Sequence, residues 1–106
     1  MNKVMINGRL IKEPEFVELE NNNSKCTIFI ANDHYMGQTK QTGFYRAVAW
    51  GKLGKIVAEN CKTGTELFIT GRLEQHSYQD ENGKTIYDVG IVIEQFDFGS
   101  KSIEGK

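Results

Sequence analysis

The sequence predicts an all-β domain that contains one short helix. Apolar residues recur at every second position in most of the ordered stretches, and only one stretch has the 3 and 4 spacing of a helix face. The 106 residues suit one domain with its own core, and we expect it to cover residues 1–100, with 101–106 as a short polar end. No apolar run approaches the roughly 20 residues that span a membrane.

The first strand is predicted over residues 3–12, where Val4 and Ile6 share one face. The Asn and Ser cluster at residues 21–24 tolerates left-handed backbone angles and predicts a turn. A second strand at residues 26–31 follows it, so these segments form a hairpin.

Residues 32–43 are polar and contain glycine, which predicts a long, mobile loop. The next strand, residues 44–51, has two distinct faces. Tyr45, Ala47 and Ala49 share the face that we expect to point inward. The other face combines large aromatic residues with an arginine, and it consists of Phe44, Arg46, Val48 and Trp50. Such a face suits stacked nucleobases, although aromatic residues in a strand are equally consistent with a core.

A single helix is predicted after this strand. Leu53, Ile56, Val57 and Cys61 fall on one helix face, and Gly64 supplies a stop.

Two further strands are predicted after the helix. Residues 65–78 return to period two, the sequence of residues 80–83 is a strong hairpin signal, and the last strand ends near Phe98. The order of three strands, one helix between strands 3 and 4, and two strands is that of the five-stranded OB-fold barrel, many of which bind oligonucleotides.

The charges are unevenly distributed. The net charge is −1 and the pI is near 6.1, which disfavours indiscriminate nucleic-acid binding. Residues 34–64 nevertheless hold five cations and one carboxylate, whereas residues 13–33 hold five carboxylates and one lysine. The molecule is either electrically two-sided or simply carries ordinary solvated charges.

The residues give little support to a catalytic or metal site. Cys26 and Cys61 are isolated, so we expect free buried thiols, with a disulfide as the alternative. His34 and His76 are far apart in sequence, no metal-binding spacing is present, and no catalytic grouping or cofactor motif is visible. The N-terminus lacks a secretory signal, so a cytoplasmic location is expected.

Several short motifs give the chain a family resemblance. They are Asn2-Lys3-Val4, Gly8-Arg9-Leu10, Trp50-Gly51-Lys52-Leu53 and Gly71-Arg72-Leu73. Their order and spacing across residues 2–98 resemble bacterial single-stranded DNA-binding proteins.

The resemblance implies sequence-independent binding of single-stranded DNA, near the nucleoid, by a homo-oligomer that is most often a tetramer. By position it implies base stacking by Tyr35, Phe44, Trp50 and Tyr78. It also implies phosphate contacts by Arg46, Lys52, Lys62 and Arg72. It implies no cofactor.

The chain departs from the family pattern at two places. Residues 74–77, Glu-Gln-His-Ser, stand where many relatives carry basic residues, so weaker or pH-sensitive binding through His76 is expected. The usual linker and acidic C-terminal tip are missing, either by trimming or naturally, so partner recruitment through a tail is not expected. An OB-fold accessory that mainly binds protein partners is the alternative function.

Overall fold

The computed structural model describes residues 1–99; residues 101–106, the predicted polar end, lie outside the described residues. Six strands, one α-helix and one 3-10 turn make up this part of the chain. They are β1 (Val4–Leu10), β2 (Glu15–Glu18), η1 (Glu20–Asn22), β3 (Ser24–Met36), β4 (Thr39–Trp50), α1 (Gly51–Asn60), β5 (Glu66–Gln79) and β6 (Thr85–Phe98).

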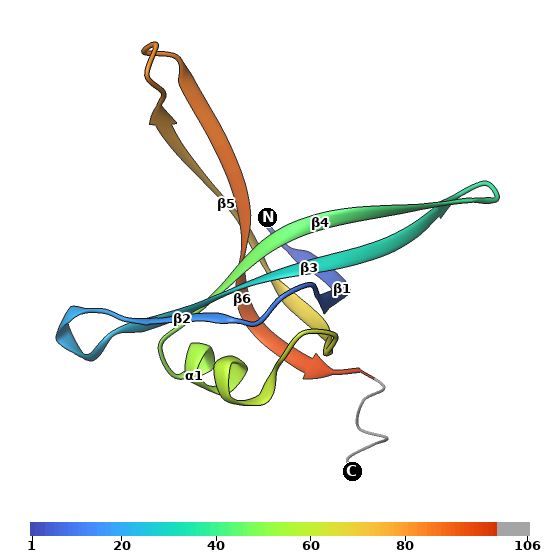
Figure 1. Ribbon diagram of the computed structural model, residues 1–106, viewed down its shortest axis with the longest axis horizontal. Coiled ribbons are helices and arrows are strands. Elements are labelled where there is room, and N and C mark those ends of the chain that lie inside the picture. Colours follow the sequence, from blue (N-terminus) through green and yellow to red (C-terminus); the bar gives the residue numbers. More distant parts are fainter. Residues whose placement is uncertain (100–106) are drawn as a thin grey trace.

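Five of the strands close into a barrel (Figure 1). The order β1-β5-β6-β4-β3 returns to β1 through the pairs Arg9 with Ala31 and Leu10 with Ile30. The short strand β2 pairs only with β3, outside the closed ring. The prediction of a five-stranded OB-fold barrel is confirmed, and because β2 adds a strand to the numbering, the helix lies between β4 and β5.

The core follows from the alternation of side chains along the strands. Val4 and Ile6 are half-buried, whereas Met5 between them is exposed, as the pattern of the first strand predicted. Ala47 and Ala49 are fully buried, which fixes their side of β4 as the inner one. The other fully enclosed side chains are apolar too, and the largest are Leu10, Cys26, Ile28, Ile30, Val57, Leu67 and Ile69.

The predicted loop over residues 32–43 is wrong, because this segment is a hairpin that extends β3 and β4. The register continues to the pair Met36 with Thr39, so only two residues form the turn. The Thr42 hydroxyl donates a 2.7 Å hydrogen bond to Asp33 across the strands. Beyond the barrel neither face has a core to cover, so polar residues occupy both faces and the period-two signal disappears.

The second hairpin, β5–β6, was predicted correctly. Its turn is closed by a 2.9 Å hydrogen bond from the Asp80 amide to the Lys84 carbonyl, and Gly83 has a positive φ of 80°. Leu73 was expected to face inward, but it is 48% exposed because β5 is leaving the barrel there. The two hairpins diverge from the barrel as separate arms (Figure 1).

The helix is shorter than predicted. It ends at Asn60, so Cys61 is buried beyond its last turn, and Ile56 is 39% exposed although it was expected on the buried face. Both cysteines are free, so the disulfide alternative is not realised. Burial raises the pKa of the Cys61 thiol to about 11, which keeps it protonated and unreactive at neutral pH.

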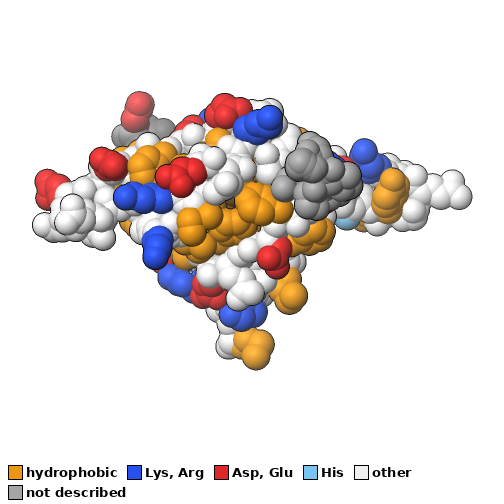
Figure 2. Space-filling view, turned by 90° about the horizontal axis from the view of Figure 1, so that it is seen from below, with side chains coloured by type: hydrophobic (Ala, Val, Ile, Leu, Met, Phe, Trp, Pro, Cys, Tyr) orange, Lys and Arg blue, Asp and Glu red, His pale blue; other side chains and the backbone are white. Residues whose placement is uncertain are grey.

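Seen from below in Figure 1, hydrophobic side chains gather in the middle of the molecule, and acidic and basic side chains are interspersed around them (Figure 2). This face offers no continuous basic stripe. Of the described residues, no helix is long and apolar enough to cross a membrane.

Gly54 sets the distance between the helix and the barrel. A Cβ built on Gly54 would lie 2.5 Å from the Ala49 carbonyl oxygen and 3.2 Å from the Cys26 amide nitrogen. Both neighbours are backbone atoms that a rotamer change cannot move. Steric overlap should therefore outweigh the helix preference of alanine, which is about 1 kcal/mol over glycine.

We expect Gly54→Ala to lower the free energy of unfolding by about 1–3 kcal/mol, as overpacking does elsewhere. Urea unfolding, followed by Trp50 fluorescence, measures it. Glu59→Ala on the exposed side of the same helix is the control and should change stability by less than about 0.5 kcal/mol. Unchanged or increased stability of Gly54→Ala would show that the helix does not pack as tightly as described.

Candidate functional site

The outer faces of β3 and β4 form one continuous surface. Residues paired across the two strands lie on the same side of the sheet, and the register is unbroken from Lys25 with Trp50 to Tyr35 with Lys40. Because Ala47 and Ala49 are buried, their neighbours point outward. We call this surface the outer face of β3–β4; it comprises Lys25, Thr27, Phe29, Ala31, Asp33, Tyr35, Lys40, Thr42, Phe44, Arg46, Val48 and Trp50.

The outer face of β3–β4 brings three predicted aromatic residues into one row. Trp50 is 48% exposed at one end, Phe44 is 66% exposed further along β4, and Tyr35 is 70% exposed on the arm. The alternative that Phe44 and Trp50 belong to the core is therefore not realised. Tyr35 lies in a paired strand rather than a loop, so the hairpin fixes its side of the sheet.

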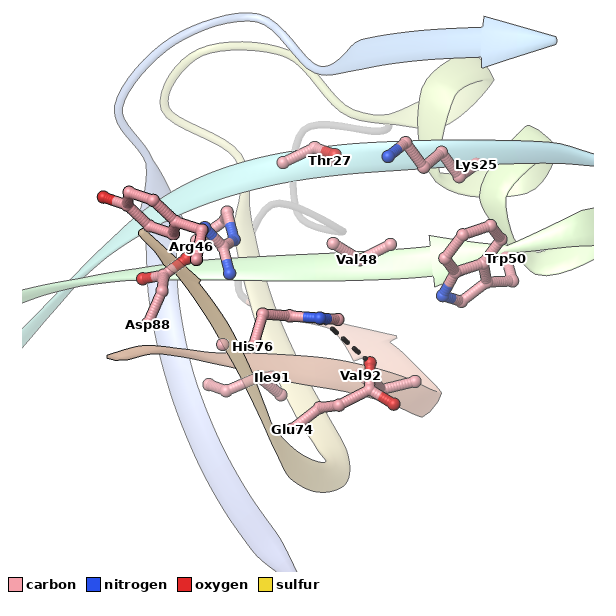
Figure 3. A pocket seen from close by; sticks show the side chains of 12 residues that line it. Lys25, Thr27, Arg46, Val48, Trp50, Glu74, His76, Asp88, Ile91 and Val92 are labelled. Atoms are coloured by element: carbon pink, nitrogen blue, oxygen red, sulfur yellow. Dashed lines mark hydrogen bonds and ion pairs between the residues drawn. The ribbon is translucent and has the colours of Figure 1, made fainter. Parts of the chain in front are cut away.

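A groove lies beside this row, where β4 meets β6. The two strands run parallel and pair through Ala47 with Ile91 and Val48 with Val92. The groove has a volume of about 390 Å³ and is built by β3, β4, β5 and β6 (Figure 3). Its lining residues are Lys25, Thr27, Arg46, Val48, Trp50, Glu74, His76, Tyr78, Asp88, Gly90, Ile91 and Val92.

Trp50 and Tyr78 reach the groove from different strands. Lys25 holds its ammonium nitrogen 5.6 Å from the centroid of the Trp50 ring, a cation–π arrangement. Tyr78 is 58% exposed and lies opposite Ile86 in the β5–β6 ladder. Two partly exposed aromatic rings and a lysine side chain therefore border a single groove.

Arg46 is held on the groove by a carboxylate. Its Nη1 donates a hydrogen bond to Oδ2 of Asp88, and the side chains are 31% and 44% exposed. The guanidinium also lies against Gly90, because a Cβ at that position would be 2.8 Å from Nη2. In Figure 3 Arg46 and Asp88 occupy one end of the groove, and Trp50 and Lys25 the other.

Further polar contacts follow β5 away from this pair. His76 Nε2 lies 3.4 Å from Glu74 Oε1, and Arg72 Nη2 lies 3.9 Å from Glu74 Oε2. Arg72 also donates a 3.3 Å hydrogen bond to Glu94, which accepts a second hydrogen bond, of 3.0 Å, from Lys3. Arg72 therefore has two carboxylate partners and does not line the groove.

The other two predicted basic residues lie elsewhere. Lys52 is exposed on the first turn of α1, directly after the corner that Trp50 forms, and outside the groove lining. Lys62 follows the end of α1 and lines a different hollow with Phe98. The structure thus brings together Arg46, Trp50 and Tyr78, continues their surface to Phe44 and Tyr35, and leaves Lys62 apart.

Sequence reasoning missed several residues of the site. Lys25 and Phe29 belong to the outer face of β3–β4, and the period-two pattern of β3 could have indicated them. Asp88 lines the groove because β6 runs beside β4, which no local pattern reveals, whereas Glu74 reaches the groove from the same face of β5 as His76 and Tyr78. Within the described part of the chain, no group of three or more His, Cys, Asp or Glu residues could hold a metal ion.

Comparison with known proteins gives consistent matches. A model of the single-strand binding protein family matches residues 1–99. The chain is 30% identical over 98 residues to a single-stranded DNA-binding protein of Clostridium perfringens, covering 92% of this chain and 65% of the relative. It is 31% identical over 102 residues to single-stranded DNA-binding protein 1 of Clostridium acetobutylicum, covering 92% of this chain and 93% of the relative. A single-stranded DNA-binding protein of Malacoplasma penetrans is 34% identical over 94 residues, with 89% of this chain and 49% of the relative covered. The chain thus spans about two thirds of the length of the Clostridium perfringens relative and about half of the length of the Malacoplasma penetrans relative.

The contacts of Glu94 generate a prediction about acid stability. Hydrogen bonds from Lys3 and then Arg72 hold the pKa of Glu94 below its usual value of 4.5. A carboxyl group with a lowered pKa stabilises the fold above its unfolded pKa, and this contribution is lost as the pH falls through the folded pKa.

We expect Glu94→Gln to be less stable than the unmodified chain at neutral pH and the difference to shrink as the pH falls below about 4.5. Urea unfolding across this range measures the effect. Glu81→Gln, in the β5–β6 turn, is the control and should show no such convergence, because Glu81 forms no ion pair among the described residues. A constant gap between Glu94→Gln and the unmodified chain at every pH would contradict the prediction.

Proposed function

Because this chain belongs to the single-strand binding protein family, we propose that it binds single-stranded DNA without regard to base sequence. Binding would consist of base stacking and phosphate contacts, with no covalent step. The relatives that the chain resembles are named single-stranded DNA-binding proteins, which favours DNA over the alternative of an accessory that mainly binds protein partners.

The observation that carries the proposal is the row of exposed aromatic residues on the outer face of β3–β4, which ends in the groove. Trp50, Phe44 and Tyr35 share one side of a paired sheet, and Tyr78 borders the groove at the end of Arg46 and Asp88. Each aromatic ring can stack on any base and contributes roughly 1–3 kcal/mol per base. A row of rings therefore suits a strand of any sequence.

Phosphates would be contacted by basic residues beside this row. Arg46 and Lys25 line the groove itself, and Lys52 lies on the first turn of α1, close in sequence to Trp50. We assign Arg72 and Lys62 weaker roles. Arg72 has two carboxylate partners, and Lys62 would meet DNA only on a path that continues past the helix.

We also propose that the chain acts as a homo-oligomer, for which a tetramer is the form that the family resemblance implies. The N-terminal part of β1 pairs with β5, and its pairing with β3 involves only Arg9 and Leu10. On this part of β1 Met5 is 81% exposed, on β5 Phe68 is 49% exposed, and both line a hollow of about 330 Å³. An open strand edge next to exposed apolar side chains suits pairing with a second copy.

The proposed domain covers residues 1–100. We place the protein with DNA in the cytoplasm, where it would protect single strands during replication, recombination or repair.

The first experiment tests binding and stacking. Titration with oligo-dT should quench Trp50, the only tryptophan, and the affinity should fall as salt rises. Trp50→Ala and Tyr78→Ala, measured by anisotropy of a labelled oligonucleotide, should each weaken binding by about 5- to 150-fold, which corresponds to roughly 1–3 kcal/mol.

Phe16→Ala is the matched control for these variants. Phe16 is 37% exposed on β2 and lies outside the groove, so its removal should leave the affinity within about twofold. Oligo-dT affinity of Trp50→Ala equal to that of the unmodified chain would contradict stacking at the groove.

The second experiment tests the oligomer. Phe68→Asp and Met5→Asp would each bury a charge in the proposed contact, so light scattering should report a smaller species than for the unmodified chain. Phe16→Asp is the control and should keep the mass of the unmodified chain. If Phe68→Asp and Met5→Asp keep the mass of the unmodified chain, as Phe16→Asp should, the surface around Met5 and Phe68 is not the subunit contact.

A further inference from the structure

Cations and carboxylates are equal in number in the groove. It is lined by two cations, Lys25 and Arg46, and two carboxylates, Glu74 and Asp88, together with His76. A surface that binds nucleic acid through phosphates is expected to be basic. The balance therefore requires an explanation at the level of individual residues.

The two cations differ in their partners. Lys25 has no carboxylate within ion-pair distance among the described residues, and its ammonium lies over Trp50. Arg46 is hydrogen-bonded to Asp88 and lies flat against Gly90, two residues further along the same face of β6. On the neighbouring strand, His76 lies opposite Asp88 and Glu74 lies opposite Gly90.

A phosphate that binds Arg46 must displace Asp88 or accept a position beside its negative charge. Either route costs free energy that a phosphate at Lys25 does not meet. A cation that is already neutralised within the protein also releases fewer counter-ions from the nucleic acid, so its contact adds less to the salt dependence of binding.

We propose that Asp88 is an intramolecular competitor for phosphate at Arg46. It holds the guanidinium in place in the empty groove, lowers the affinity for single strands and weakens the dependence of affinity on salt. Binding in this groove then depends more on stacking by Trp50 and Tyr78 than on phosphate contacts. Asp88 acts as a positioning residue through Arg46, and this inference rests on the proposed function.

The test is the variant Asp88→Asn, which keeps the size of the side chain and a hydrogen-bond acceptor but removes its charge. Oligo-dT is titrated against Trp50 fluorescence at salt concentrations from about 50 to 400 mM. One freed cation should steepen the slope of log affinity against log salt by about 0.7. If the gain in affinity of Asp88→Asn over the unmodified chain vanishes at 1 M salt, this gain should be about 8-fold at 50 mM and about 3-fold at 200 mM.

Two controls isolate the pair. Glu18→Gln removes one carboxylate charge on β2, outside both the groove and the proposed subunit contact, and should leave the slope unchanged. In an Arg46→Ala background, Asp88→Asn should no longer steepen the slope, because the competitor has lost the cation for which it competes. A merely structural role for Asp88 would not move the slope in this way.

The inference is overturned if Asp88→Asn has the slope of the unmodified chain, if it binds more weakly, or if the steepening persists without Arg46. Equal steepening by Glu18→Gln would also overturn it, because the effect would then come from net charge alone. If the unmodified chain binds oligo-dT and one of these results is found, only this inference fails. If neither the unmodified chain nor Asp88→Asn binds oligo-dT at any salt concentration, the proposed function fails with it.

Discussion

The parallel pairing of β4 with β6 is the constraint on which the site depends. It involves only the pairs Ala47 with Ile91 and Val48 with Val92, and both Ala47 and Ile91 are buried. This short seam places the strand of Arg46 and Trp50 beside the hairpin that carries Tyr78. Without it the aromatic residues of β4 would face solvent on an isolated hairpin, and no groove would form.

Closure of the barrel at the opposite seam depends on a glycine. A Cβ on Gly8 would lie 2.8 Å from the Ala31 carbonyl oxygen, so only glycine lets β1 approach β3 this closely. The pair Leu10 with Ile30 then forms, and both side chains are fully enclosed. The rigid barrel fixes the directions in which the two hairpin arms leave it. The β3–β4 arm carries Tyr35, and the β5–β6 arm carries Tyr78. Both residues lie beyond the core, so their rings stay exposed.

The sequence predicted the fold well, because alternation along the strands reflects burial directly. It also predicted which side of β4 carries Phe44, Arg46 and Trp50, since the two small alanines mark the inner side. It failed over residues 32–43, where the arm has no core face and therefore no apolar period. It could not predict Asp88 beside Arg46, because 42 residues separate them and only the β4–β6 seam brings them together.

Counting charges along the chain gave a surplus of cations over residues 34–64, yet the surplus does not describe the surface. Arg46 and Lys40 each have an aspartate partner, Asp88 and Asp33, supplied from another part of the chain. What a strand of nucleic acid meets is the charge that remains after this pairing, and in the groove that remainder is close to zero. The Trp50 ring has an internal partner too, but that partner is the Lys25 ammonium, so it adds a positive charge beside the stacking surface instead of a negative one. In the proposed mode of binding, base stacking in this groove therefore contributes more than phosphate contacts, and the phosphates contribute only as far as the carboxylates give way.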